Sequence, residues 1–183
     1  MHVPPEARGF VLFASDRPWI RLNRRQIDLS EALNESGLGT LLFDLVDAGD
    51  DVEGNLEGLV ERLLGASGWI SERWGVAGLP LGYVSSGLGS AAALVAAAAL
   101  GPELSAVAVR GGRPDLAGAA LGKVQAATLF AFSGDDPIEA EAAISAAGRV
   151  RGPQRIRNYP SHEGSDGSWA ATPAICSWMR WHL

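Results

Sequence analysis

The sequence has little of what defines several classes of protein. It holds one cysteine, Cys176, so no disulfide can form within the chain. Its first residues lack the basic segment and the long apolar stretch of a secretion signal. The longest apolar run, around residues 91–100, is too short and too rich in alanine for the ~20 residues that span a bilayer. These absences predict a cytoplasmic protein with no membrane partner, and the apolar run is interpreted as a buried helix.

Positive charge is also scarce. The chain has 15 lysines and arginines against 21 acidic residues, for a net charge of −6. This balance repels a phosphate backbone, so we expect no nucleic-acid partner. No Gly-x-Gly-x-x-Gly pattern or P-loop follows the first apolar run, which disfavours a nucleotide-binding domain of the flavodoxin type. We therefore expect no cofactor and no bound metal, and the oligomeric state stays open.

Apolar residues make up 47% of the 183 residues, enough for one hydrophobic core. We therefore expect a single domain over residues 1–183. Short apolar runs alternate with segments of helical periodicity, which is typical of a parallel sheet covered on both faces. Strands are predicted at 10–14, 40–45, 81–85, 106–110, 128–133 and 155–159. Helices are predicted at 24–36, 52–74, 87–100, 137–147 and 172–182. The pattern predicts a three-layer α/β fold with a doubly wound, mainly parallel, six-stranded sheet in the order 2-1-3-4-5-6.

One segment carries most of the functional information. Residues 81–93, LGYVSSGLGSAAA, read as a buried strand, a tight turn of small residues and a helix. This resembles the nucleophile elbow of the α/β hydrolases, G-x-S-x-G, in which small residues let the helix approach the strand. If Gly89 is the last small residue, Gly87 stands at the nucleophile position. Ser86 is then one residue early, and its side chain is expected to point away from the pocket, because neighbouring positions at the end of a strand face opposite ways.

Other segments resemble a group of small hydrolases related to dienelactone hydrolases, which have no lid. They are EALNESGLGTLLFDL at 31–45 and RGGRPDLAG at 110–118. The resemblance implies a minimal α/β-hydrolase fold with an acid after the fifth strand and a histidine in the loop after the sixth. Asp136, next to Asp135, and His162 match these two positions, in the chain order of the family. The resemblance makes Asp136 and His162 the candidate catalytic residues.

The loop after the first strand departs from the family. Where a His-Gly-rich loop normally donates an N–H to the oxyanion, this chain has Ser15, Asp16, Arg17, Pro18 and Trp19, with no glycine. A carboxylate at Asp16 opposes the negative charge that an oxyanion hole stabilises. Conventional serine hydrolysis is therefore disfavoured. The candidate substrate contacts are Ser15, Trp19, Ser86, Gly87 and Leu88.

Several interpretations remain open. Asp136 precedes Pro137, so it also fits a helix N-cap, and His162 also fits an exposed loop residue. Three functions are compatible with the sequence. The first is a diverged hydrolase-fold protein with a small-molecule pocket, in which the His–Asp pair performs non-hydrolytic acid–base chemistry. The second is an active esterase or lactonase that uses Ser85 or Ser86, and the third is a binding protein without catalysis.

Overall fold

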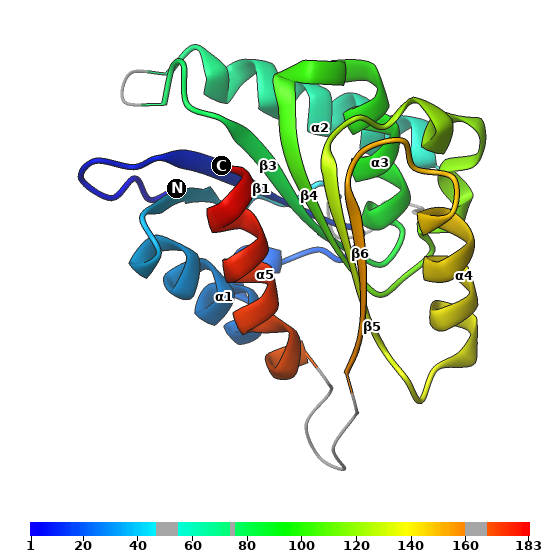
Figure 1. The fold of residues 1–183 in the computed structure, drawn as a ribbon. Helices are drawn as coiled ribbons and strands as arrows, with labels where there is room; N and C mark the ends of the chain where they lie inside the picture. The colour runs from blue at the N-terminus through cyan, green and yellow to red at the C-terminus, as the bar shows by residue number, and fades with distance from the viewer. Residues whose placement is uncertain (47–54, 74–75, 160–167) are drawn as a thin grey trace.

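Six parallel strands form one sheet in the order β2-β1-β3-β4-β5-β6 (Figure 1), as the sequence predicts. The structure is a computed structural model that describes residues 1–46, 55–73, 76–159 and 168–183. The strands are β1 (Gly9–Ser15), β2 (Leu38–Leu41), β3 (Leu81–Ser86), β4 (Leu104–Arg110), β5 (Ala127–Ser133) and β6 (Gln154–Tyr159). Apolar residues fill the central strands because helices cover both faces.

Five α-helices and three 3₁₀ helices connect the strands within the described residues. The α-helices are α1 (Arg24–Glu35), α2 (Leu56–Ser71), α3 (Gly89–Leu100), α4 (Pro137–Ala147) and α5 (Ser168–His182). The 3₁₀ helices are η1 (Ile20–Leu22), η2 (Gly101–Glu103) and η3 (Pro114–Lys123). Figure 1 shows α1 and α5 together on one face of the sheet, and α2, α3 and α4 on the other. This is a three-layer α/β fold, and the described residues form no lid over the sheet.

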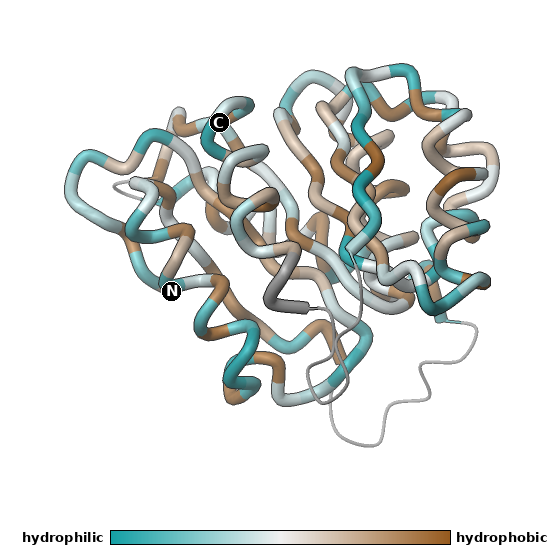
Figure 2. The backbone as a smooth tube through the Cα atoms, turned by 60° about the horizontal axis from the view of Figure 1, so that its bottom comes forward, coloured by the Kyte–Doolittle hydropathy of each residue, from teal (hydrophilic) through white to brown (hydrophobic). Residues whose placement is uncertain are grey.

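Each face of the sheet has its own hydrophobic cluster. On the α1 and α5 side, Phe13 packs with Leu33 and Met179, all at most 1% exposed. On the other side, α3 presents an almost unbroken run of alanines to the sheet, and these small side chains let it pack close to β3 and β4. Figure 2 shows hydrophobic segments in the interior of the molecule and hydrophilic ones on many of the outer turns. No helix among the described residues combines the length and apolarity needed to span a membrane.

The predicted boundaries that differ most from the structure are those of the second strand, the second and third helices, and the last helix, which begins at Ser168 rather than at residue 172. The second strand was placed at 40–45 but runs from Leu38 to Leu41, because Asp44 turns away to accept a hydrogen bond from the Ile20 N–H at 2.8 Å. The second helix begins at Leu56, where Asn55 caps it through the Gly58 N–H; residues 52–54, 74 and 75 lie outside the described part of the chain. The third helix begins at Gly89 rather than at Gly87. No strand or helix predicted from the sequence covers η3.

Candidate functional site

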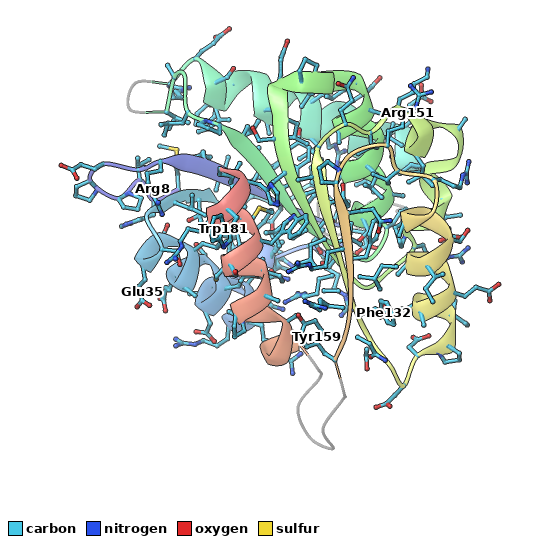
Figure 3. All side chains as sticks on the ribbon, viewed as in Figure 1. Arg8, Glu35, Phe132, Arg151, Tyr159 and Trp181 are labelled. Atoms are coloured by element: carbon cyan, nitrogen blue, oxygen red, sulfur yellow. The ribbon has the colours of Figure 1, made fainter. Side chains whose placement is uncertain are left out.

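A cavity of about 710 Å³ opens at the carboxyl ends of the strands. In a doubly wound sheet the ligand crevice lies where the strand order reverses, here between β1 and β3. The described residues that line it are Ser15, Arg17, Pro18, Ile20, Asn23, Arg25, Gln26, Ser86, Gly87, Arg110, Gly111, Ala131, Phe132, Ser133, Glu139, Tyr159 and Ala171. Figure 3 shows Phe132 and Tyr159 at this end of the sheet and Arg151 at the opposite end.

The turn between β3 and α3 has the geometry of a tight elbow. Gly87 has φ 61°, a left-handed conformation that favours glycine. A Cβ on Gly89 would lie 2.5 Å from the carbonyl oxygen of Ala14 on β1. Only a glycine at position 89 therefore lets α3 start this close to the sheet, as the small-residue pattern predicts.

The carboxylate of Asp16 reaches this turn from the loop after β1. Its Oδ2 accepts a hydrogen bond from the Leu88 N–H at 2.7 Å. A Cβ built on Gly87 would overlap Asp16 Oδ1 and lie 2.6 Å from its Cγ. Asp16 thus occupies the space that a side chain at position 87 would need.

The glycine pair after β4 supports the same turn from the other side. A Cβ on Gly112 would overlap the carbonyl oxygen of Gly87 and lie 2.7 Å from its Cα. Gly112 donates its N–H to Glu139 Oε1 on α4 at 2.7 Å. The unusual Arg-Gly-Gly segment therefore lets the chain pass directly against Gly87.

The two serines before the turn have different surroundings. Ser86 lines the cavity, and its hydroxyl donates to the Ser15 hydroxyl at 3.3 Å. This corrects the expectation that its side chain points away from the pocket. Ser86 still belongs to β3, and alternation along this strand places its side chain on the face opposite to that of the buried Ser85, beside its register partner Ser15. Ser85 is buried, 1% exposed, and donates to the carbonyl oxygen of Ala108 at 3.4 Å.

The two predicted catalytic residues are not among the described residues that line the cavity. Asp136 is exposed and caps α4, where its Oδ1 accepts from the Ile138 N–H at 2.9 Å and the Glu139 N–H at 3.1 Å. It is not among the lining residues. His162 falls within 160–167, outside the described residues, so the Asp136–His162 pair stays a prediction.

Two predicted substrate contacts are also absent from the described lining. Trp19 is 52% exposed, and its backbone adopts a left-handed conformation with φ 61°. Leu88 packs against the hydrophobic cluster on the α3 side of the sheet. Of the five predicted contacts, Ser15, Ser86 and Gly87 line the cavity.

Charged residues that the sequence analysis did not single out also line the cavity. Arg110 ends β4, Arg17 follows β1, Arg25 lies in the first turn of α1, and Glu139 lies on α4. Burial and, to a smaller extent, the nearby Arg25 lower the pKa of Arg110 to about 10, and Glu139 partly opposes this shift. The guanidinium therefore keeps its charge at neutral pH. The available signal was the position of Arg110 as a lone charge at the carboxyl end of a buried strand.

Two further groups affect the electrostatics of this end of the sheet. Burial raises the pKa of Tyr159, so its phenol stays protonated at neutral pH and can donate a hydrogen bond. Arg113 and Asp115, which follow β4, form an ion pair at 2.7 Å. The described residues contain no cluster of three metal-ligating side chains.

Solved structures share this architecture. Dienelactone hydrolase from Anabaena variabilis is 31% identical, with a TM-score of 0.90 over 99% of this chain and 89% of its own. This chain belongs to the dienelactone hydrolase family of α/β hydrolases. Est1E from Butyrivibrio proteoclasticus shares the fold, with 13% identity and a TM-score of 0.82 over 99% of this chain and 92% of its own. No family model matches the sequence.

The curated relatives of this α/β hydrolase carry a different name. A protein described as "Putative phosphoribosyl transferase" in two strains of Mycobacterium tuberculosis is 40% identical over 143 residues. The match covers 76% of this chain and 32% of the relative. The chain therefore spans about a third of the length of the curated relatives that it matches.

Proposed function

We propose that this protein is a diverged α/β hydrolase whose small-molecule pocket works without a serine acyl-enzyme. We take Gly87 to stand at the nucleophile position, on the strength of the strand, the left-handed turn and the close start of α3. The observation that carries the proposal is the position of Asp16. Its carboxylate fills the space of a side chain at position 87 and accepts the N–H of Leu88.

That N–H matters because the residue after the nucleophile donates to the oxyanion in this fold. A carboxylate already bound to it blocks the donor and repels a developing negative charge. Loss of the nucleophile costs about 10⁶-fold in a serine hydrolase. Loss of one oxyanion donor costs about 10²–10³-fold. Both changes act against acyl transfer at Gly87.

Without acyl transfer, we propose that the site catalyses proton transfer. His162, oriented by Asp136, would act as the acid–base group for hydration, elimination or cyclisation of a bound small molecule. The cap of α4 is compatible with this role, since both of its hydrogen bonds end on Oδ1 of Asp136 and a histidine would bind Oδ2. A binding protein without catalysis is the alternative.

The name of the curated relatives does not alter this proposal. The 143 matched residues make up 32% of those proteins. We assign the phosphoribosyl transferase name to the two thirds that this chain does not match. The residues of this chain that match them belong to its α/β-hydrolase-like fold.

A fluorophosphonate probe tests the absence of a serine nucleophile. We expect the folded protein to remain unlabelled and to leave a panel of short-chain esters and lactones intact. Labelling of Ser86 or Ser85, abolished by Ser86→Ala or Ser85→Ala, would contradict the proposal and establish an esterase. The double variant Asp16→Gly with Gly87→Ser restores a hydroxyl at the turn and frees the Leu88 N–H. It should gain labelling at position 87, and it serves as the positive control.

The proton-transfer role has a separate test. For any substrate that the protein converts, His162→Ala should abolish turnover and Asp136→Asn should reduce it. Turnover that is unchanged in His162→Ala would contradict the role. If a compound binds stoichiometrically and leaves unchanged, the binding-protein alternative is favoured.

A further inference from the structure

We propose that a second cavity, between β6 and α5, binds a small molecule that carries a carboxylate or a phosphate on a planar aromatic ring. This cavity has a volume of about 480 Å³ and shares no described lining residue with the cavity at the carboxyl ends of the strands. The described residues that line it are Leu129, Arg155, Arg157, Ala174, Ser177, Trp178, Trp181 and His182. The inference goes beyond the proposed function and does not depend on it.

The face of α5 that lines this cavity differs from the face that packs on the sheet. Ala171, Ile175 and Met179 recur every four residues and are buried in the core. Both tryptophans of α5 lie on a second stripe beside this core stripe, because three- and four-residue spacing keeps side chains on one helix face. The residues of this second stripe that line the cavity are Ala174, Ser177, Trp178 and Trp181.

Trp178 is held in the wall of the cavity by contacts on several sides. Its indole N–H donates to the carbonyl oxygen of Ala127 at 3.2 Å, and its ring centroid lies 4.3 Å from that of His182. The guanidinium of Arg155 lies over the same indole, 5.9 Å from the ring centroid. Burial and, to a smaller extent, Arg155 lower the pKa of His182, so its imidazole is uncharged at neutral pH. The positive charge of this wall therefore comes from arginine.

Trp181 differs from Trp178 in having a free ring. It is 79% exposed and forms no hydrogen bond or ring contact with another described residue. Figure 3 shows it on α5, nearer the amino ends of the strands than Tyr159. Aromatic rings attract one another in offset-stacked or edge-to-face arrangements. Trp181 therefore offers an indole face on which the planar ring of a ligand can stack.

Two arginines make this cavity cationic. Arg155 and Arg157 are two residues apart on β6, so their side chains lie on the same face of the sheet. No acidic residue is among the described lining residues, and within the described part of the chain neither arginine forms an ion pair or a hydrogen bond. Guanidinium groups bind carboxylate and phosphate oxygens through pairs of parallel hydrogen bonds. In a protein whose net charge is −6, two such cations in one cavity indicate a site for an anion.

Charge on an edge strand also has a simpler explanation. β6 is the last strand of the sheet, and charged residues on an edge strand prevent it from pairing with another sheet. That role needs only the charges and does not account for the two tryptophans beside them. Guanidinium groups next to indole faces favour an aromatic anion, because its charge meets the arginines while its ring stacks on Trp181. A volume of about 480 Å³ lies within the range of small-molecule sites.

Isothermal titration calorimetry with benzoate and with phenyl phosphate tests the inference. Each probe is titrated into the full chain at pH 7.5, with sodium chloride holding the ionic strength constant. We expect at least one of them to bind with a Kd of about 1 mM, and the pair shows which anionic group the site prefers. Two reference compounds separate the charge from the ring. Cyclohexanecarboxylate has the charge without the planar ring, benzyl alcohol has the ring without the charge, and each should bind about fivefold more weakly or worse.

Substitutions on both sides of the cavity locate the binding. Trp181→Ala and, separately, Arg155→Gln should each weaken binding by about fivefold or more. Both side chains are exposed, so both variants should fold as the parent does. Trp69→Ala and Arg73→Gln are the matched controls. The guanidinium of Arg73 lies 3.9 Å from the ring centroid of Trp69 at the end of α2, where the pair lines neither cavity, and its loss should leave affinity unchanged.

The inference is overturned if neither probe binds, or if Trp181→Ala and Arg155→Gln both keep the parent affinity, since binding then occurs elsewhere. It is also overturned if the control variants weaken binding equally. Equal affinity for cyclohexanecarboxylate or for benzyl alcohol would contradict the proposed class of ligand. The fluorophosphonate experiment reports on the turn at Gly87 instead. Failure of the proposed function and failure of this second site are therefore distinguishable.

Discussion

At the starts of α3 and α4, a carboxylate accepts backbone N–H groups. The two carboxylates come from different parts of the chain. At the start of α4, Asp136 accepts the N–H groups of residues two and three positions along the chain. At the start of α3, Asp16 accepts the Leu88 N–H from 72 residues away. A negative charge is favourable at both helix starts. The first interaction is local, whereas the second needs the whole sheet to be assembled.

The difference also decides what each helix start can do. Asp136 is exposed and its position follows from the Asp-Pro pair at the beginning of the helix. Asp16 is half-buried against a glycine that has no room for a side chain. The contact at α3 therefore couples two loops at the candidate site, and that at α4 stabilises its own helix.

The largest effect should come from adding a side chain at the tertiary contact. Gly87→Ala forces a Cβ into Asp16 and imposes a left-handed conformation on alanine. We expect a loss of about 3 kcal/mol in the free energy of unfolding, measured by urea denaturation. Gly65→Ala in α2 is the matched control, since a Cβ there meets nothing within 4 Å. A loss below about 1 kcal/mol would show that Asp16 can move aside.

Removing the carboxylate of Asp16 should lower the free energy of unfolding by less than Gly87→Ala does. Asp16→Ala leaves the Leu88 N–H without its charged acceptor, at about 2 kcal/mol in the same urea assay. The variant should also relieve part of the penalty of Gly87→Ala, so the double-mutant cycle should show a coupling of about 1 kcal/mol or more. If the effects of Asp16→Ala and Gly87→Ala on stability are additive, the two positions are not energetically coupled, which would contradict this prediction.

Removing the carboxylate of Asp136 should have a still smaller effect on the free energy of unfolding. Asp136→Ala deletes the cap of α4 and should lower stability by about 1 kcal/mol. Asp136→Asn should stay within a few tenths of a kcal/mol of the parent, because asparagine caps as well as aspartate. Thermal and urea unfolding measure both. If the asparagine variant loses as much as alanine, charge rather than hydrogen bonding is what Asp136 supplies.

The smallest effect is expected at a third helix start, that of η3. The Arg113 guanidinium, which hydrogen-bonds Asp115, lowers the pKa of that carboxyl below its ordinary value. A lowered carboxyl pKa stabilises the folded state at neutral pH, and this contribution disappears as the pH falls through the folded pKa. Asp115→Asn should therefore be slightly less stable than the parent at pH 7, and the gap should narrow in acid. A gap that widens in acid would contradict the assignment.

Local patterns explain how much of this architecture could be predicted. Five of the six strands were predicted to within two residues. Four of them, β1, β3, β4 and β5, are buried and have nearly continuous apolar sequence, whereas β6 is an exposed edge strand of mostly polar residues. The second strand was misplaced because residues 42–45 are apolar enough to continue it, yet Asp44 turns to η1 and pairs with Arg21 at 2.8 Å. Pro114–Lys123 was missed because a 3₁₀ segment with a non-helical Gly118 has no steady periodicity.

The residues of the candidate site also fall into those that could be predicted from the sequence and those that could not. Gly87 and the small residues around it could be found from the sequence, since a turn with positive φ and a close helix start both require glycine. Arg25 and Glu139 could not, because nothing in the local sequence tells that the first turns of α1 and α4 border the same cavity. The sequence showed that Asp16 carries a charge near the predicted oxyanion site. It did not show that the carboxylate fills the space beside Gly87.

The sequence by itself therefore determined the positions of five of the six strands along the chain, the elbow turn and the cap of α4, all of which depend on residues close together in the chain. The tertiary structure alone decided that Asp16 meets Gly87 and that three arginines face one cavity. Strand pairing between β1 and β3 brings Ser15 beside Ser86 and carries the following loop onto the turn. Contacts of this kind depend on register and packing across the sheet, and a charge pattern read along the chain cannot specify them.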